Sequence, residues 1–308
     1  MSIRLIPNEI VKTTNGRFIS GIGLTMIDGV YVDDRKVTPG SLFVPLKDSR
    51  HSSIEKAFQK GAVATLVNRD SRTSYRIYKN NPKKIFIEVE DTLSALVEMA
   101  RFWRFKLGIA FTAIIGNKNS NQVKDLYFTV MNSSIKTADI PHKLTDSLDL
   151  SLLLMDLKAE FKKGVVGIET ENSDETEKLI YISEPSVIMI TDTVKKDIKL
   201  LKKIISNLEK EKTLILNTED PGFASLIKCA QCNVVTFGTK KADICVGKVK
   251  KQKEGQTEFV LNIFKDKTEI TAKISKEISL SDCLAAAAAA HMAGLGIDEI
   301  KKGLEGIN

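Results

Sequence analysis

The chain has few of the residues that build metal and disulfide sites. Among its 308 residues are three histidines and four cysteines. Cys229 and Cys232 form one Cys-x-x-Cys pair, but no second pair and no histidine cluster completes a zinc site. We therefore predict that these two thiols are structural, at a helix end or in the core, and that they do not form a zinc site.

Long apolar runs are also missing. No stretch approaches the roughly 18 apolar residues that a membrane-spanning helix needs, and the first ten residues lack the apolar core of a signal peptide. With 43% hydrophobic and 28% charged residues, the composition is that of a globular protein long enough for about two domains. We expect a cytoplasmic protein with no membrane span.

Aromatic residues make up only 6% of the chain, and they do not interleave with its lysines. The net charge is +7, and the densest lysine run lies between residues 195 and 212. Excess lysine can favour nucleic acid or another anionic ligand. Here the spacing over residues 194–209 places the lysines mainly opposite an apolar helix face, which favours a solvated surface over a nucleic-acid site. Nucleic-acid binding through this face is kept as a third hypothesis.

The most consequential missing feature is the Gly-Lys-Ser/Thr ending of a nucleotide-binding loop, in residues 111–126. A short β-branched apolar run at 112–115 is followed by turn-forming residues at 116–121 and then by helical spacing. A strand that enters a helix through a small-residue turn is where α/β proteins hold phosphate groups. A nucleotide-binding P-loop also ends in Gly-Lys-Ser/Thr, which wraps the phosphates and holds Mg²⁺. Here the ending is Asn119-Ser120-Asn121, so the frame of a nucleotide loop is present without its chemistry.

Strand and helix patterns alternate along most of the chain. The first part carries short strand-like runs and ends in a predicted helix, from about residue 91 to 106, that links two domains. The later part adds strands at 164–169, 187–191, 213–216 and 234–238, a hairpin over 258–274 and an alanine-rich helix. This order predicts an α/β protein with a small N-terminal α/β domain over residues 1–107. A central α/β domain with a mainly parallel sheet is predicted over residues 108–308.

Several segments resemble, in the same order, signatures of the Mur ligase family, and most closely its members that add D-alanyl-D-alanine to UDP-MurNAc-tripeptide. They are Val32–Leu46, Lys60–Ala64, Val89–Leu96, Leu216–Pro221 with Thr236–Gly238, and the run from Leu284 to Ile300. The resemblance implies a first domain that holds the UDP part of the substrate and a P-loop-like central domain that binds ATP. It also implies a third, Rossmann-like domain, and ATP-dependent amide-bond formation through an acyl phosphate.

The departures from this resemblance lie at the positions that would bind the nucleotide and Mg²⁺. The nucleotide-binding position comprises Gly116, Asn117, Lys118, Asn119, Ser120 and Asn121. Gly116 is kept, the P-loop lysine is replaced by Ser120, and Lys118 lies two residues early. The resemblance assigns Mg²⁺ binding to Glu169, whose neighbours do not match, so no metal ligand is predicted beyond that residue. The chain ends where the resemblance places the third domain.

The position that the resemblance assigns to the UDP group keeps Arg35 but has Asp34 where the family has serine. The carboxylate would face a uridine or diphosphate there. Both residues are therefore interpreted as a vestigial substrate-binding position.

We therefore predict a catalytically inactive Mur-ligase-like protein, without catalytic residues or a cofactor. It would act as a binding, scaffolding or regulatory module linked to peptidoglycan or cell-envelope biosynthesis. A protein partner or self-association is expected at the surface left by a missing third domain, and a UDP-muramyl-peptide is a second candidate ligand. The alternative is a divergent amide-bond ligase that uses Mg-ATP, Glu169 and an unrecognised lysine, with a separate chain supplying the third domain.

Overall fold

The computed structural model describes residues 3–21, 25–46, 51–69, 78–117, 120–141, 146–170, 172–193, 197–253, 256–274 and 278–307. By its contacts the chain divides into two compact units. Unit 1 comprises Met1–Gly108 and Thr145–Ala159, and unit 2 comprises Ile109–Leu144 and Glu160–Asn308. A short segment from the middle of the chain therefore belongs to the first unit. The functional division at residues 107 and 108 stays a prediction.

Unit 1 is a five-stranded sheet with helices. The strand order is β1 (Arg17–Ser20), β5 (Ile85–Val89), β4 (Ala64–Asn68), β3 (Leu42–Phe43) and β2 (Val30–Tyr31). Only the β1–β5 pair is antiparallel. The helices are α1 (Pro7–Thr14), α2 (His51–Gln59), α4 (Thr92–Leu107) and α6 (Ser147–Met155). Phe58 and Phe86 meet edge to face in its core, with ring centroids 5.4 Å apart.

Helix α4 has clear sequence signals at both ends. The Asp91 side chain accepts the Ser94 backbone N–H at 2.8 Å, and Gly108 closes the helix in the left-handed region at φ +67°. Trp103 is buried, as its helical spacing predicted, and its indole N–H donates to the Leu157 carbonyl at 3.1 Å. This bond attaches the returning segment to unit 1. No helix in the described ranges, α4 included, is long and apolar enough to cross a membrane.

Unit 2 is built on a nine-stranded sheet. From one edge to the other its strands are β14 (Asp266–Ala272), β13 (Gln256–Ile263), β12 (Ile244–Lys253), β11 (Asn233–Gly238), β10 (Thr213–Asn217), β9 (Val187–Ile190), β6 (Ala110–Gly116), β8 (Lys163–Glu169) and β7 (Thr137–Asp139). All pairs from β7 to β12 are parallel, and β12, β13 and β14 are antiparallel. The predicted α/β class and mainly parallel sheet are confirmed.

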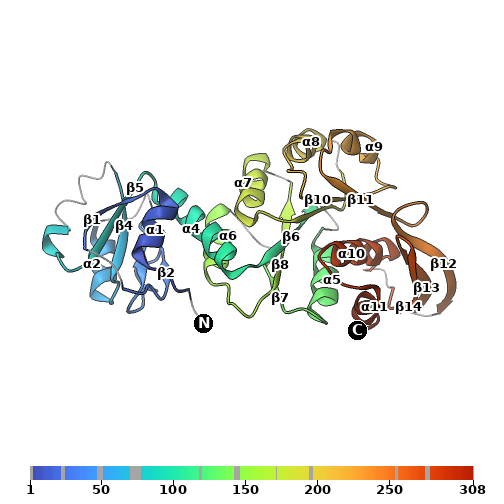
Figure 1. Ribbon diagram of the computed structural model, residues 1–308, viewed down its shortest axis with the longest axis horizontal. Helices are drawn as coiled ribbons and strands as arrows, with labels where there is room; N and C mark the ends of the chain where they lie inside the picture. The colour runs from blue at the N-terminus through green and yellow to red at the C-terminus, as the bar shows by residue number, and fades with distance from the viewer. Residues whose placement is uncertain are drawn as a thin grey trace. The chain divides into compact units, whose positions relative to one another are not determined.

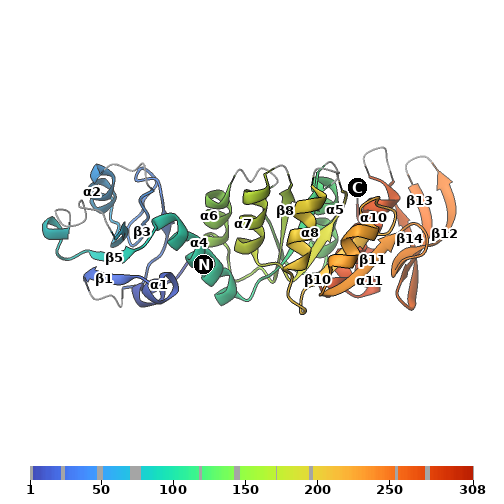
Figure 2. The same cartoon turned by 90° about the horizontal axis from the view of Figure 1, so that it is seen from above.

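The direction of the chain in this sheet reverses at β6. After β6 the chain builds β7 and β8 on one side, and it then crosses to β9, β10 and β11 on the other. Right-handed connections therefore place α5 (Ser120–Asn132) on one face. They place α7 (Ser173–Ser183), α8 (Ile198–Ser206) and the short α9 (Phe223–Leu226) on the opposite face (Figures 1 and 2). Ligands of open α/β sheets bind outside the carboxyl ends of the strands at such a reversal.

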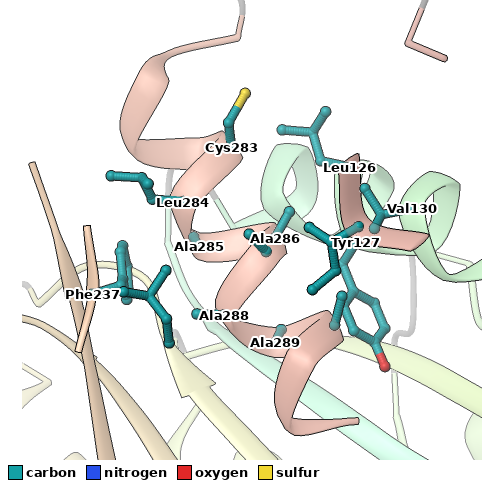
Figure 3. Packing of buried hydrophobic residues seen from close by; sticks show 14 of the residues in the cluster. Leu126, Tyr127, Val130, Phe237, Cys283, Leu284, Ala285, Ala286, Ala288 and Ala289 are labelled. Atoms are coloured by element: carbon teal, nitrogen blue, oxygen red, sulfur yellow. The ribbon is translucent and has the colours of Figure 1, made fainter. Parts of the chain in front are cut away.

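An alanine-rich helix closes the core of unit 2 on the α5 face. Helix α10 (Leu280–Met292) begins with a capping box between Ser279 and Asp282, and all six alanines at 285–290 are buried. Their small side chains let α10 lie close to α5 on one side and to Phe237 of β11 on the other (Figure 3). The last helix, α11 (Ile297–Glu305), packs on α5 and β14. The end of β6 thus stands on a rigid, close-packed base.

Candidate nucleotide-loop site

The loop after β6 lies at the switch point of the sheet. Gly116 is the last residue of β6, and Ser120 is the first residue of α5. The two residues between Asn117 and Ser120, Lys118 and Asn119, lie outside the described residues. Ser120 is fully buried, and its hydroxyl is 3.5 Å from the Asn117 carbonyl oxygen. The position that the resemblance assigns to the P-loop lysine therefore holds a short side chain directed into the protein.

A carboxylate from the neighbouring strand binds the loop. Asp192 follows β9, which pairs with β6 in parallel. Its Oδ1 atom accepts the Asn117 backbone N–H at 2.9 Å and the Thr191 hydroxyl at 2.9 Å. The Thr191 backbone N–H in turn donates to the Ile115 carbonyl at 3.0 Å, which continues the β6–β9 ladder up to the site. The negative charge of Asp192 is therefore held directly against a backbone donor of the loop.

The same two side chains fill the space above Gly116. A Cβ atom at this position would overlap the Thr191 hydroxyl and the Asp192 carboxylate, and it would lie 3.3 Å from the Ser120 Cβ. Glycine in a phosphate loop gives a ligand close access to the backbone. Here the side chains of Thr191 and Asp192 occupy the space next to the Gly116 backbone that a ligand would need.

Lys124 is the lysine of α5 and lies one helical turn after Ser120. Its side chain is fully buried, and its ammonium group contacts the carboxylate of Asp139 at the end of β7. A second carboxylate, from Asp125, lies 3.9 Å from the same nitrogen. Lys124 is therefore neutralised inside the protein and has no exposed surface to offer a phosphate group.

Glu169 lies at the carboxyl end of β8, where it is paired in register with Gly116. It is exposed, and the Asn121 amide nitrogen lies 3.5 Å from its Oε1 atom. The structure thus brings Gly116, Asn121 and Glu169 to one edge of the sheet. Among the residues that the structure describes, no group of three or more His, Cys, Asp or Glu side chains could hold a metal ion.

Two carboxylates after β10 connect it to neighbouring segments, as Asp192 connects β9 to the loop. Asp220 after β10 accepts the backbone N–H groups of Thr193 at 2.9 Å and Gly222 at 2.7 Å. Glu219 accepts the Thr239 N–H at 3.2 Å, which links β10 to the segment after β11. We call these three contacts the carboxylate bridges. Sequence reasoning missed them, although acidic residues two or three positions after the strand ends were a visible signal.

The residues predicted at the UDP position lie in the turn between β2 and β3. Arg35 is exposed, and its guanidinium donates to the carboxylate of Asp33 through Nε at 2.9 Å and through a terminal nitrogen at 2.8 Å. These hydrogen bonds, followed by the Arg35 backbone N–H, lower the pKa of Asp33 to about 2. Asp34 is half-buried beside them. The arginine of this position is thus engaged by a neighbouring carboxylate that sequence reasoning had not singled out.

The Cys-x-x-Cys pair lies beyond α9. Cys229 ends the short 3-10 helix η1 (Ile227–Cys229), as predicted, and its thiol donates to the Ser225 carbonyl at 3.5 Å. Cys232 is half-buried, and burial raises the pKa of its thiol. Both cysteines are free. A raised pKa disfavours the thiolate, so Cys232 has no sign of an activated nucleophile.

The sheet order, the loop after β6 and the alanine-rich closing helix define the class of protein. The sequence model of the Mur ligase middle domain matches residues 124–290, a little over half of the chain. The chain belongs to the Mur ligase family, as its motifs indicated.

Among known proteins the chain is similar to ligases named UDP-N-acetylmuramoyl-tripeptide–D-alanyl-D-alanine ligase. It is 25% identical to the one from Buchnera aphidicola subsp. Acyrthosiphon pisum, over 98% of this chain and 68% of that protein. It is also 25% identical to the Bacillus subtilis ligase, over 92% of this chain and 62% of that protein. The chain thus spans about two thirds of the length of these relatives.

Solved structures of MurF show the same fold. MurF from Acinetobacter baumannii superimposes with a TM-score of 0.83 at 18% identity, over 100% of this chain and 69% of that one. MurF from Thermotoga maritima, solved in complex with ADP, gives a TM-score of 0.72 at 16% identity, over 91% of this chain and 66% of that one. The predicted relationship to the MurF branch is confirmed.

Proposed function

We propose that this chain is a Mur ligase family protein without ligase activity. It serves as a binding, scaffolding or regulatory module linked to peptidoglycan or cell-envelope biosynthesis in the cytoplasm. The relationship to ligases of UDP-N-acetylmuramoyl peptides supports that link. The observation that carries the loss of activity is the Asp192 carboxylate on the Asn117 N–H, in a loop whose lysine position is the buried Ser120.

The chemistry of phosphoryl transfer explains why these two features matter together. Catalysis of this step depends on backbone donors and cations that offset the charge of the phosphates. Here one donor is occupied by an anion, and the one lysine described in α5 is paired with Asp139. Two like charges about 4 Å apart repel by about 4 kcal/mol near a protein surface. The described residues of this site therefore supply no available lysine to offset the charge of the phosphates, and the proposal needs no cofactor.

The proposed ligand of the module is a protein partner, a second copy of the chain, or a UDP-muramyl-peptide. The peptide is supported by the substrate in the names of the relatives, and its binding would not need the phosphate loop of unit 2. We expect it to bind unit 1, since the residues at the predicted UDP position lie there.

Calorimetric titration of the full chain with Mg-ATP tests the proposal. With the protein shown to be folded by circular dichroism, no saturable heat is expected up to millimolar nucleotide. The same sample, incubated with Mg-ATP, UDP-N-acetylmuramoyl-tripeptide and D-alanyl-D-alanine, should release no phosphate and form no amide bond. Micromolar nucleotide binding together with product formation would contradict the proposal.

The second candidate function is a divergent ligase that works with a separately supplied third domain. The observation in its favour is the arrangement of Gly116, Asn121 and Glu169 at one edge of the sheet. This function predicts saturable Mg-ATP binding that Glu169→Ala abolishes. Unchanged nucleotide binding by the folded Glu169→Ala variant would count against it.

A further inference from the structure

We propose that Glu305 guards an open edge of the unit 2 sheet and keeps β14 from pairing with β14 of a second copy of the chain. Strand β14 is the last strand of the nine-stranded sheet, and among the described strands it pairs with β13 alone. Such an edge presents unpaired backbone N–H and C=O groups, onto which another strand can add. This edge is separate from the loop after β6, so its role does not depend on the loss of ligase activity.

Glu305 is the last residue of α11, which packs beside β14 (Figure 1). Its Oε1 atom accepts the backbone N–H of Thr271 at 3.1 Å. This N–H therefore points away from β13, toward the open side of the strand. Because backbone groups alternate along a strand, the N–H and C=O groups of Lys267 and Glu269 point to the same open side. The Glu305 carboxylate thus occupies one end of the open edge.

The opposite edge of the sheet is closed by the same kind of contact. Strand β7 forms that edge, and the Lys136 carbonyl and the Ile140 N–H both bond toward β8. By alternation, the backbone of Thr137 faces the open side. Its N–H donates at 3.2 Å to the Oδ1 atom of Asn132, the last residue of α5. At both edges, therefore, a side chain at the end of an adjacent helix accepts an outward N–H group.

Charge complementarity favours a second copy of β14 as the strand that would add to this edge. The Lys267 and Glu269 side chains are exposed and lie on one face of β14. In an antiparallel pair about a twofold axis, Lys267 of each copy can lie opposite Glu269 of the other, which forms two cross-strand ion pairs. In that register Thr271 lies opposite residue 265 of the second copy, whose carbonyl would accept the Thr271 N–H.

Glu305 opposes this pairing at both ends of the twofold ladder. Its carboxylate occupies the position that the carbonyl of residue 265 of the second copy would take beside Thr271. With that end closed, the open edge of each copy shrinks to residues 266–269. Two-stranded pairings this short are marginal in water, so the guarded edge should not associate.

Sedimentation velocity of the full chain and its variants over a range of concentrations tests the guard. Glu305→Ala frees the Thr271 N–H, so it should lower the dissociation constant for self-association at least about tenfold relative to the parent chain. Asp298→Ala removes the same charge from the exposed first turn of α11, and it should stay within about twofold of the parent. No gain in folded Glu305→Ala, or an equal gain in Asp298→Ala, would overturn the proposal.

A double variant tests the register. When Lys267→Glu is added to Glu305→Ala, each cross-strand ion pair becomes a like-charge pair, so the gain in self-association should be lost. A gain that persists in the double variant would show that the association does not use the proposed pairing of β14.

Hydrogen exchange locates the new contact. At a concentration where Glu305→Ala dimerises, the backbone amides of Lys267 and Glu269 should exchange at least about tenfold more slowly than in a dilute sample. Dimerisation without this protection would place the contact elsewhere and would also overturn the proposal. Glu305 is exposed and alanine is a good helix former, so the variant is expected to fold. Nucleotide binding by the parent chain bears on the proposed function, whereas these ratios between variants test the edge.

Discussion

The ammonium group of Lys124 contacts the carboxylate of Asp139 inside unit 2, although the two residues belong to different layers. Lys124 lies on α5 with no exposed side-chain surface, while the Asp139 side chain at the end of β7 keeps about a third of its surface exposed. The pair attaches the helix to the edge strand next to the loop. It also removes from the loop the only α5 lysine that the structure describes.

Removing one partner of this pair should have unequal effects. Asp139→Asn leaves the buried ammonium group with only the more distant carboxylate of Asp125, so we expect a loss of about 3–5 kcal/mol in the free energy of unfolding. Lys124→Met replaces the buried charge with an apolar chain of similar length, while the remaining carboxylate reaches solvent, so its cost should be smaller. Urea denaturation followed by circular dichroism measures both. Asp125→Asn, which alters the more distant and exposed carboxylate, should stay within about 0.5 kcal/mol of the parent chain.

The close approach of α11 to α5 makes Gly303 a sensitive position. A Cβ atom there would lie 2.8 Å from the Val130 Cα atom and 3.1 Å from its carbonyl oxygen. Alanine favours a helix over glycine by about 1 kcal/mol, but the clash with backbone cannot be relieved by a side-chain rotation. We expect Gly303→Ala to lower the melting temperature, with a net loss of about 1–3 kcal/mol. Lys302→Ala, an exposed change on the same helix, should leave it nearly unchanged.

The buried thiol of Cys283 predicts how unit 2 responds to alkaline pH. Burial, and to a smaller extent the charge of Asp282, raises the pKa of Cys283 from 9.0 to about 12. Between these two pH values the unfolded chain loses this proton while the folded chain keeps it, so stability falls as pH rises. The slope contributed by one such group is about 1.4 kcal/mol per pH unit. Cys283→Ala should therefore show a shallower loss of stability above pH 9, and an identical slope in both proteins would contradict the assignment.

The single tryptophan reports on the packing of α6. Leu154 of α6 is fully buried in the same unit as Trp103, whose indole donates to the Leu157 carbonyl. Leu154→Ala should cost about 2–5 kcal/mol through the cavity that it leaves. It should also shift the tryptophan emission to longer wavelength, because water gains access to the indole. Lys158→Ala, an exposed change in the same segment, should alter neither the emission nor the urea midpoint.

The elements with strong local signals were predictable. The run at 112–115 became β6, the predicted helix from about 91 to 106 became α4 at 92–107, and the hairpin over 258–274 is formed by β13 and β14. The lysine-rich helix ends at residue 206 rather than at the predicted 209, and residues 194–196 of that prediction lie outside the described residues. Lys203 on this helix pairs with Glu177 at 2.6 Å. Periodicity, capping residues and glycine stops were sufficient in these cases.

Elements whose partners are distant in sequence were missed. Strand β12 contains glycine and several lysines, and its polar composition hides a strand that is defined by pairing with β13. Helix α6 is apolar on nearly every side and shows no amphipathic pattern, because it is packed against α4 from another part of the chain. Each is specified by tertiary contacts, which local patterns do not contain.

The candidate site was predicted in part for the same reason. Gly116, Ser120 and the missing lysine were visible in one short motif. Asp192 was not recognised as part of the site, because it reaches Asn117 across 75 residues of sequence. Only the adjacency of β6 and β9 brings the two together, and that adjacency is a property of the strand order.

The return of residues 145–159 to unit 1 limits how the chain can be divided. A cut after residue 108 would separate α4 from α6, and the buried leucines Leu150 and Leu154 would lose the helix that covers them. A fragment that begins at residue 109 would therefore carry an exposed apolar helix in the middle of its sequence and would tend to aggregate. A single cut in the chain therefore cannot separate the two units intact, even though each has its own sheet.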